Sequence, residues 1–398
     1  MNLINHKNFF VFYGLTRSYN YSQELKLCEK FLHKALPQNS TIITTNIDDN
    51  TLQPLHNAIV TNLNRISEND YVLIMQEPAL MIMKDSIDEM IKILAQHPHI
   101  ECVIPSDNRD HSSLSITPYF TLRGFQQFLL QLQDKTMEYH NWDNRKPDIF
   151  LIKGDALKSI DIPQHPLDIP KNLKNTVISQ RAFIHSFKGY YNERREEIIP
   201  IIPPNTKTFL DLGCARGNFG RLIKSKIPGS YVVGIEQNEH EAHIAQNKLD
   251  KVIIGNVLNS CIDEKFDCVT CLDMLEHIVD PEALLLKIKN DFLTPNGVLV
   301  LSIPNIGHWS IIEDLLAGRW DYIPAGTLCT THLRFFTLHT IKNLLKESGF
   351  RVKSVHSADA PPPKRLLSTF DRLKQYSKLE INEASLTALS YYIVAQKS

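Results

Sequence analysis

Short apolar runs alternate with amphipathic stretches over the whole chain. In the second half, several of these runs end at an acidic or amide residue and are followed by a turn. Runs of this length predict buried strands, and apolar residues at helical spacing between them predict helices with one buried face. The strands predicted in the second half are 208–211, 231–236, 251–254, 266–272, 297–303, 350–356 and 391–395. Strands that alternate with helices predict an α/β fold.

The first half shows the same alternation with its own set of strands. We predict strands at 9–13, 41–45, 70–75 and 100–104, with an amphipathic helix between the first two and another between the last two. A chain of 398 residues is also too long for one ordinary domain. We therefore predict two α/β domains, 1–188 and 189–398, of which the first is the smaller.

Two further helices have recognisable end signals. The stretch 190–199 predicts a helix that stops at Pro200, because proline has no backbone N–H and does not continue a helix. Thr337 suits the N-cap of a later helix, and Gly349 suits the C-cap at the other end of it.

Composition excludes several classes of protein. Lys+Arg total 43 and Asp+Glu total 44, so nothing indicates a surface for nucleic acid or for a membrane. No run approaches the roughly 20 apolar residues that span a bilayer. The first residues lack the pattern of a signal peptide, and 7 cysteines without framework spacing fit a reducing compartment. We expect a cytoplasmic protein with no nucleic-acid partner and no membrane span, whose oligomeric state stays open.

Two patterns resemble metal sites. Cys268 and Cys271 form a C-x-x-C, but they lie in a predicted strand, where residues three apart point to opposite faces. The run from His240 to His243 is one residue short of the metalloprotease pattern H-E-x-x-H, and a solvated helix face explains it more simply. We therefore predict no metal site.

The strand at 208–211 leads into the motif Asp211-x-Gly213-x-Ala215-x-Gly217. Small residues at a turn between strand and helix let a ligand approach the backbone closely, and the helix start offers unpaired N–H groups. The spacing differs from the G-x-G-x-x-G of dinucleotide-binding proteins. Taken alone, the motif is also compatible with a purely structural turn.

Acidic and amide residues recur after the next strands. Glu236 ends the second strand of this half, and its carboxylate can accept hydrogen bonds from both hydroxyls of a ribose. Asn256 follows the third strand and Asp273 the fourth. Carboxylates and turn amides at the ends of successive strands predict one shared ligand.

In order and content, this series resembles the class I S-adenosylmethionine-dependent methyltransferases, whose first motif is usually D/E-x-G-x-G-x-G. The resemblance implies a Rossmann-like sheet of seven strands, the last inserted antiparallel between the fifth and sixth, and S-adenosylmethionine as cofactor. Ala215 replaces the usual second glycine and Asn256 the usual aspartate near the adenine, and both changes weaken the expected contacts. The cofactor-binding residues that the resemblance implies are Tyr191, Asp211, Gly213, Cys214, Ala215, Gly217, Glu236, Gln237, Asn256, Val257, Asp273 and Met274.

The run from Met274 to His277 resembles that of ubiquinone-pathway O-methyltransferases. Methyl transfer from a sulfonium needs alignment in a dry site, and a hydroxyl acceptor also needs a base. We predict His277 as this base, because histidine has a reference pKa of about 6.5 and suits neutral pH. The alternative is that Glu276 and His277 only cap the segment that follows.

The segment between the fifth strand and Thr337 is rich in aromatic and basic residues, and it occupies the usual place of a substrate lid. From 190 to about 355 the chain resembles methyltransferases that are often fused behind a glycosyltransferase domain in bacterial surface-polysaccharide gene sets. We predict that His308, Trp309 and Arg334 contact the acceptor, with His332 as a reserve base. Packing of the lid is the alternative role for these side chains.

Over 68–105 and 147–157, the first domain resembles the nucleotide-sugar-binding fold of family 2 glycosyltransferases. Those enzymes carry paired aspartates that hold a divalent metal on the sugar diphosphate, whereas Gln76-Glu77-Pro78 leaves one carboxylate here. We predict a degenerate domain that no longer transfers sugar and acts as a docking surface or a residual sugar-binding pocket. An unrelated α/β domain for assembly is the alternative.

Together, these patterns predict an O-methyltransferase for a saccharide or another small hydroxylated acceptor. Two alternatives remain: a non-catalytic cofactor-binding scaffold, which Ala215 and Asn256 favour, and a bifunctional glycosyltransferase and methyltransferase. Titration with S-adenosylmethionine separates a binder from a non-binder, and release of S-adenosylhomocysteine with an acceptor separates an enzyme from a binder.

Overall fold

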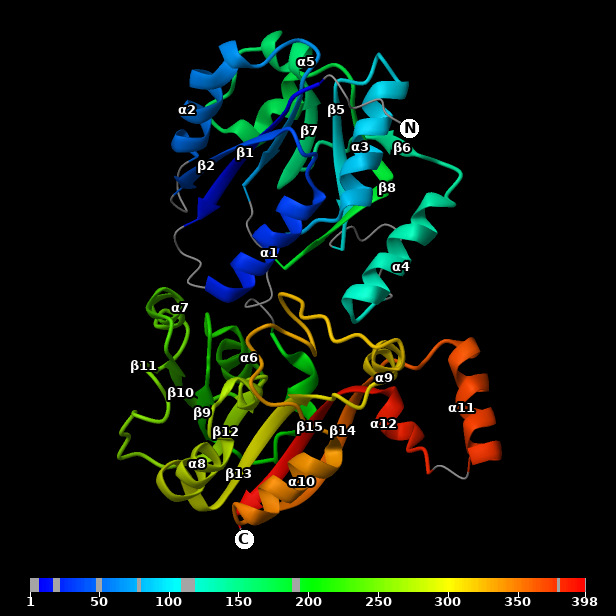
Figure 1. Ribbon diagram of the computed structural model, residues 1–398. Helices are drawn as coiled ribbons and strands as arrows, with labels where there is room; N and C mark the ends of the chain where they lie inside the picture. The colour runs from blue at the N-terminus through cyan, green and yellow to red at the C-terminus, as the bar shows by residue number, and fades with distance from the viewer. Residues whose placement is uncertain are drawn as a thin grey trace. The chain divides into compact units, whose positions relative to one another are not determined.

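The computed structural model describes residues 7–16, 22–47, 52–76, 80–108, 119–187, 194–377 and 380–397. The chain forms two compact units, each built around its own sheet (Figure 1). The first unit comprises Met1–Lys188 with Tyr322–Ala325, and the second comprises Gly189–Asp321 with Gly326–Ser398. Among the helices of the described segments, none has the length and apolar character needed to cross a membrane.

The first unit contains a mixed sheet that has 8 strands within the described residues. Its order is β2-β1-β3-β7-β5-β8-β4, and β6 pairs with β8 off this path. The strands are β1 Phe9–Thr16, β2 Ser40–Ile47, β3 Tyr71–Met75, β4 Leu80–Met81, β5 Cys102–Asp107, β6 Tyr139–Asn141, β7 Ile149–Lys153 and β8 Thr176–Ser186. The four strands predicted in this part are all present. β7 runs antiparallel to both of its neighbours, β3 and β5, an arrangement that local patterning does not specify.

Helices cover this sheet, and they include the stretches where apolar residues at helical spacing predicted a helix. In α3, the residues Ile87, Met90, Ile91 and Leu94 are buried on one face, whereas Asp85 is exposed. The helices of the first unit are α1 Ser22–Ala35, α2 Gln53–Asn62, α3 Lys84–Gln96, α4 Leu122–Gln133 and α5 Gly154–Lys158, with 3-10 turns η1 Leu63–Arg65 and η2 Pro166–Asn172.

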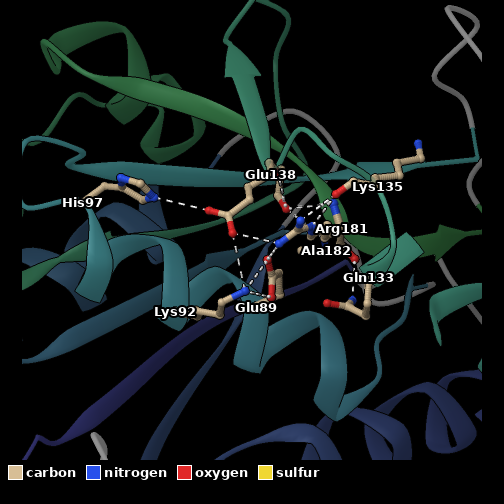
Figure 2. A network of polar contacts seen from close by, with 9 residues as sticks. Glu89, Lys92, His97, Gln133, Lys135, Glu138, Arg181 and Ala182 are labelled. Carbon is tan, nitrogen blue, oxygen red and sulfur yellow. Dashed lines mark hydrogen bonds and ion pairs between the residues drawn. The ribbon is translucent and has the colours of Figure 1, made fainter. Parts of the chain in front are cut away.

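A charged network joins α3, the connection between α4 and β6, and strand β8 (Figure 2). Arg181 of β8 donates to Glu138 at 2.8 Å and to the backbone oxygen of Lys135 at 3.1 Å. Glu89 of α3 is only 5% exposed and lies 3.8 Å from Arg181 and 3.2 Å from Lys92. Burial tends to raise the pKa of Glu138, but His97, Lys92 and Arg181 outweigh it and hold this pKa below its usual value.

Replacing Arg181 with alanine is expected to destabilise the first unit by about 2–4 kcal/mol, because it removes the guanidinium that pairs with Glu138 and leaves the buried Glu89 with Lys92 as its remaining cationic partner. The matched control is Lys84→Ala, whose partner Asp88 is 41% exposed. Exposed pairs contribute about 0–1 kcal/mol, so this control should unfold close to the wild type. Urea denaturation followed by circular dichroism measures both changes. Equal losses in the two variants would contradict a structural role of the buried network.

The second unit contains a seven-stranded sheet within the described residues, with the order β11-β10-β9-β12-β13-β15-β14. β15 is antiparallel to both β13 and β14, so the predicted position of the last strand between the fifth and sixth is confirmed. The strands are β9 Thr208–Leu212, β10 Tyr231–Glu236, β11 Lys251–Ile254, β12 Phe266–Leu272, β13 Leu293–Pro304, β14 Phe350–Asp359 and β15 Ala388–Lys397. The last three are longer than predicted, because polar residues at their ends continue the pairing.

Helices pack on both faces of this sheet. Phe219 and Leu222 of α6 belong to one apolar cluster, and Leu284 of α8 and Ile341 of α10 belong to the cluster on the other face. Thr337 is the N-cap of α10 and forms a capping box, as its residue type predicted. The helices are α6 Asn218–Lys226, α7 Glu239–Ala245, α8 Pro281–Lys287, α9 Trp309–Leu316, α10 Leu338–Glu347, α11 Lys364–Ser377 and α12 Glu383–Thr387, with the short turns η4 Glu196–Ile201, η5 Leu275–His277 and η6 Ile288–Phe292.

Two predictions about local structure need correction. The helix expected at 190–199 is, in its described part, a 3-10 turn that starts at Glu196 and includes Pro200. Each 3-10 hydrogen bond spans only three residues, so a short turn tolerates a proline that would interrupt an α-helix. The expected solvated face of α7 is also wrong for Glu241, which is 2% exposed and binds Arg216 at 2.6 Å.

The C-x-x-C pattern lies in β12, as predicted. Cys268 packs in one apolar cluster of the second unit and Cys271 in the other, so the two thiols point to opposite faces of the sheet. Burial raises the pKa of both thiols, which disfavours the thiolate that metal binding and redox chemistry require.

Candidate active site

The glycine motif forms a tight turn between β9 and α6. Gly213 and Gly217 both have left-handed backbones, with φ of 68° and 70°. The N–H groups of Gly213 and Cys214 donate to the backbone oxygen of Ile235 at 2.9 and 3.1 Å, which fastens the turn to the end of β10. A Cβ on Gly217 would also lie 3.2 Å from the Cα of Ala245. Glycine is therefore required at this position by both conformation and space.

Ala215 is the departure from the usual glycine, and it too is left-handed, with φ of 45°. Its N–H donates to Oε2 of Glu236 at 2.9 Å, and the N–H of Asn238 donates to Oε1 at 2.8 Å. The carboxylate of Glu236 therefore supports the turn as well as lying at its rim. Each carboxylate oxygen has a second lone pair with which it can accept from a ligand. Burial raises the pKa of Glu236.

Asp211 lies at the carboxyl end of β9 and is 3% exposed. It accepts a hydrogen bond from the Thr270 hydroxyl of the neighbouring strand β12 at 2.6 Å. Burial raises the pKa of Asp211 to about 7, with the Glu236 carboxylate adding to this effect and the Thr270 hydroxyl and Arg195 opposing it. The site therefore contains a carboxyl group that titrates close to neutrality.

This carboxyl group makes the stability of the cofactor-free chain depend on pH. A raised pKa means that the folded chain keeps a proton that the unfolded chain releases, so the stability is full below about pH 4 and falls as the pH rises to about 7. In the variant Asp211→Asn this contribution disappears, and the unfolding midpoint of the second unit should vary less between pH 4.5 and 7.5. Thermal melts at several pH values measure it. Identical slopes in the variant and the wild type would contradict the assignment.

Asp273 follows β12 and has a left-handed backbone, with φ of 48°. Its carboxylate accepts from the Ser302 hydroxyl at 2.7 Å and forms an ion pair with Arg195. Arg195 also binds Glu197 at 2.6 Å and lies over the ring of Tyr392. Burial tends to lower the pKa of Arg195, but Asp273 and Glu197 outweigh it and raise this pKa.

Asp211, Glu236 and Asp273 come from three adjacent strands, β9, β10 and β12, and each lies at or just beyond a carboxyl end. The structure therefore brings these predicted residues to one edge of the sheet beside the turn. Sequence reasoning missed Arg195, which lies 78 positions from Asp273 and carries no motif of its own. The stretch that carries Arg195 was predicted only as part of a helix over 190–199, which gave this side chain no role in the site.

The other predicted cofactor residues have more varied surroundings. Met274 packs against the turn, since a Cβ on Gly213 would lie 3.3 Å from its sulfur. Asn256 is exposed and uses its side-chain oxygen to accept from Leu258 at 2.8 Å. Gln237 is exposed next to Glu236. The side chains of Cys214 and Val257 are buried in the apolar clusters, which leaves only their backbones to meet a ligand. Tyr191 lies outside the described residues.

Beyond β12, the turn η5 meets the segment before α10. The N–H groups of Leu333 and Arg334 donate to the backbone oxygen of Glu276 at 2.8 and 3.0 Å. This contact brings the rings of His277 and His332 together edge to face, with centroids 4.7 Å apart. The two histidines that sequence analysis proposed as bases are therefore neighbours.

The two histidines are held in the same way. Nδ1 of His277 lies 3.2 Å from the backbone oxygen of Thr331, and Nδ1 of His332 lies 3.0 Å from that of Thr327. A carbonyl oxygen only accepts, so Nδ1 carries the proton in both rings and Nε2 presents a lone pair. Burial lowers the pKa of His277, and it lowers the pKa of His332 to about 4. Both rings are neutral at pH 7.

Two of the predicted acceptor contacts, His308 and Trp309, bind elsewhere, whereas Arg334 lies beside this cluster. His308 is fully buried, and its ring lies 2.8 Å from the Ser310 hydroxyl and 3.1 Å from the backbone oxygen of Ala360. Trp309 donates to the same Ala360 oxygen at 2.8 Å, so both side chains fasten the start of α9 to the segment after β14. Arg334 is exposed and donates to the backbone oxygen of Val279 at 2.5 Å.

Comparison with known proteins fits this geometry. Residues 182–355 match the family model described as a methyltransferase domain. The chain is 28% identical over 177 residues to a ubiquinone biosynthesis O-methyltransferase of Hydrogenovibrio crunogenus, covering 42% of this chain and 71% of the relative. A mitochondrial ubiquinone biosynthesis O-methyltransferase of Schizosaccharomyces pombe is 27% identical over 206 residues, covering 48% of this chain and 69% of the relative. A relative of the same description in Pasteurella multocida is covered over 58% of its length.

Among solved structures, an S-adenosylmethionine-dependent methyltransferase of Archaeoglobus fulgidus matches with 20% identity and a TM-score of 0.39, covering 53% of this chain and 98% of that one. The family match and the curated relatives place a methyltransferase domain in the second half of the chain. The protein is an S-adenosylmethionine-dependent methyltransferase, and S-adenosylmethionine is its cofactor. The carboxylates at the ends of three adjacent strands and the left-handed glycine turn suit this cofactor.

Proposed function

We propose that the enzyme methylates a hydroxyl group of a small acceptor. The first candidate for this acceptor is a saccharide or a polysaccharide precursor. The observation that carries the proposal is the pair of neutral histidines, each with Nε2 available as a lone pair, beside the turn that follows β12. A hydroxyl acceptor needs a group that takes its proton, and a neutral imidazole does so at pH 7. The curated relatives are O-methyltransferases by name, which agrees with an oxygen acceptor.

The cofactor is proposed to lie along the edge formed by β9, β10 and β12. Glu236 would accept from the ribose hydroxyls, and the turn from Gly213 to Gly217 would lie against the rest of the cofactor. Asp273, with Arg195 bound to it, would define the boundary towards the acceptor. The remaining predicted positions contribute through backbone groups where their side chains are buried.

Bound S-adenosylmethionine supplies a methyl group that is bonded to a sulfonium sulfur. This sulfur is the leaving group when an acceptor oxygen attacks the methyl carbon in line. His277 is proposed to accept the hydroxyl proton at Nε2, while its Nδ1–H bond to Thr331 fixes the ring. His332 is the reserve base. Enclosure by the surrounding buried residues would keep water out and hold the acceptor oxygen, the methyl carbon and the sulfur in line, which can contribute roughly 7–11 kcal/mol.

The first unit is proposed to be a degenerate glycosyltransferase-like domain, with a boundary to the methyltransferase domain near residue 188. It contains a pocket of about 240 Å³ lined by residues of β5, of β8 and of the segment 145–149 that leads into β7, with charged residues of both signs in its wall. Its charged lining residues are Asp107, Arg145, Lys146 and Asp148. Such a lining suits the hydroxyl and phosphate groups of a residual saccharide ligand. Of the motif Gln76-Glu77-Pro78, only Gln76 is among the described residues.

The test measures S-adenosylhomocysteine released by the full-length enzyme with a panel of acceptors: nucleotide sugars, free sugars and simple phenols. Stimulation by a saccharide supports the proposal, and stimulation by phenols alone would place the acceptor in a different class. Cofactor binding without release for any acceptor would favour the scaffold alternative. Hydrolysis of a nucleotide sugar in the presence of Mn²⁺ would contradict the loss of glycosyl transfer.

A further inference from the structure

Glu276 is a buried carboxyl group with an unusual environment. It is 1% exposed, and among the residues that the structure describes neither of its side-chain oxygens has a hydrogen-bond partner. Burying an unpaired carboxyl group is costly, and such a group is usually paired or bound to an ion. In the same cluster, Nε2 of His332 lies 3.9 Å from Oε1 of Glu276. This separation is too long for a hydrogen bond.

Glu276 is part of a set of three donors. One atom from each of Glu276, His277 and His332 lies within 4.8 Å of the others. Both histidines use Nδ1 on a backbone carbonyl, which leaves Nε2 as the donor atom. Metal-bound histidines in proteins typically have this second bond, because it fixes the tautomer and the direction of the ring.

We propose that Glu276, His277 and His332 form a binding site for one divalent transition-metal ion, of which Zn²⁺ is the best match. Two imidazoles and a carboxylate are a common donor set for catalytic zinc, with a further position left for water or substrate. Zinc holds such donors at about 2.0–2.2 Å, so tetrahedral donors are roughly 3.3–3.5 Å apart. The donors here, of which one pair is 3.9 Å apart and all lie within 4.8 Å of one another, must close by about 0.5–1.5 Å to bind the ion.

The frame around the donors supports an ion site. The backbone bonds from Leu333 and Arg334 to Glu276 hold the two donor segments together without using a donor atom. A bound cation would balance the charge of the buried Glu276 carboxylate, whose two oxygens have no hydrogen-bond partner among the described residues.

An ion at this site changes the chemistry proposed for His277. A nitrogen that ligates an ion does not accept a proton, so the loaded site would instead bind the acceptor hydroxyl and lower the pKa of that hydroxyl. The proton then leaves to solvent, and the oxygen uses its electron pair to bond the methyl carbon as the carbon–sulfur bond breaks. This consequence rests on the proposed methyl transfer, whereas the ion site rests on the three side chains alone.

The experiment titrates Co²⁺ into the chelator-treated full-length protein in the absence of acceptor, and then displaces it with Zn²⁺. We expect one Co²⁺ per chain with visible d–d absorption, lost on adding Zn²⁺. His332→Ala and Glu276→Gln should each weaken binding about 100-fold or more, since changes even beyond the direct ligands cost about 10–100-fold. The matched control is His339→Ala, an exposed histidine on α10, which should bind Co²⁺ as the wild type does.

Binding of S-adenosylmethionine is measured on the same samples, so that loss of the fold is not mistaken for loss of the ion site. Glu276→Gln keeps the side-chain volume and serves if His332→Ala does not fold. Wild-type protein that binds the cofactor but no Co²⁺ would overturn the ion site, and so would unchanged Co²⁺ binding in both variants. Protein that binds Co²⁺ but no cofactor would instead contradict the cofactor site.

Discussion

Replacing His277 with alanine is expected to lower the turnover number about 100-fold or more, while the affinity for S-adenosylmethionine stays within about 2-fold of the wild type. The physical reason is that Nε2 of His277 is the lone pair presented beside the predicted acceptor position, and loss of a general base typically costs 10²–10⁴-fold. The proposed cofactor contacts come from β9, β10 and β12 and do not involve this ring. Rates of S-adenosylhomocysteine release at saturating acceptor measure the effect.

The control is His339→Ala, which removes a histidine from the exposed face of α10 and should keep full turnover. The measurement is made with chelator and again with Zn²⁺, because the ligand role of His277 and its role as a base respond differently to the ion. If His277→Ala retains turnover, His332→Ala is the next variant to test. Full activity in both would mean that catalysis depends on alignment alone or that the acceptor is already ionised.

Replacing Glu236 with alanine is expected to weaken S-adenosylmethionine binding by about 1.5–3 kcal/mol, or roughly 10–150-fold. The change removes the proposed ribose acceptors. It also leaves the N–H groups of Ala215 and Asn238 without their carboxylate partner, so the turn itself loses support. Isothermal titration calorimetry measures the affinity.

Two variants sharpen this test. Glu236→Gln keeps one oxygen acceptor and should fall between the wild type and Glu236→Ala. Glu239→Ala removes a carboxylate from the first turn of α7, where the side chain is 77% exposed, and should bind the cofactor normally. Unchanged affinity in Glu236→Ala would contradict the placement of the ribose at the end of β10.

The sequence predicted the strands of the second unit and the edge where Asp211, Glu236 and Asp273 meet. It did so because both depend on local information: strand period, the turn glycines and the residue at each strand end. The position of the antiparallel last strand was also predicted. The resemblance to class I methyltransferases supplied the strand order, which the spacing of apolar residues does not give. The first unit shows the limit, because its strands were found but the antiparallel position of β7 depends on long-range pairing.

The unpredicted parts of the site depend on contacts distant in sequence. Arg195 meets Asp273 across 78 positions, a contact that no local pattern carries. The role of a side chain also depends on which buried groups it contacts, and residue type alone does not show this. His308 and Trp309 suited an acceptor contact by composition, yet both use their polar atoms on the backbone of Ala360. No pattern in the sequence indicated that the two oxygens of Glu276 would be buried without a partner.

The position of β15 between β13 and β14 has a consequence for synthesis on the ribosome. β13 ends at Pro304, but its antiparallel partner is complete only at Lys397. At roughly 5–20 residues per second, translation needs about 5–20 s to cover this distance. Over that interval the apolar edge of β13 stays unpaired and open to other nascent chains. The yield of native enzyme should therefore respond to translation speed between these two strands, and slow codons there should increase aggregation more than the same codons placed before β9.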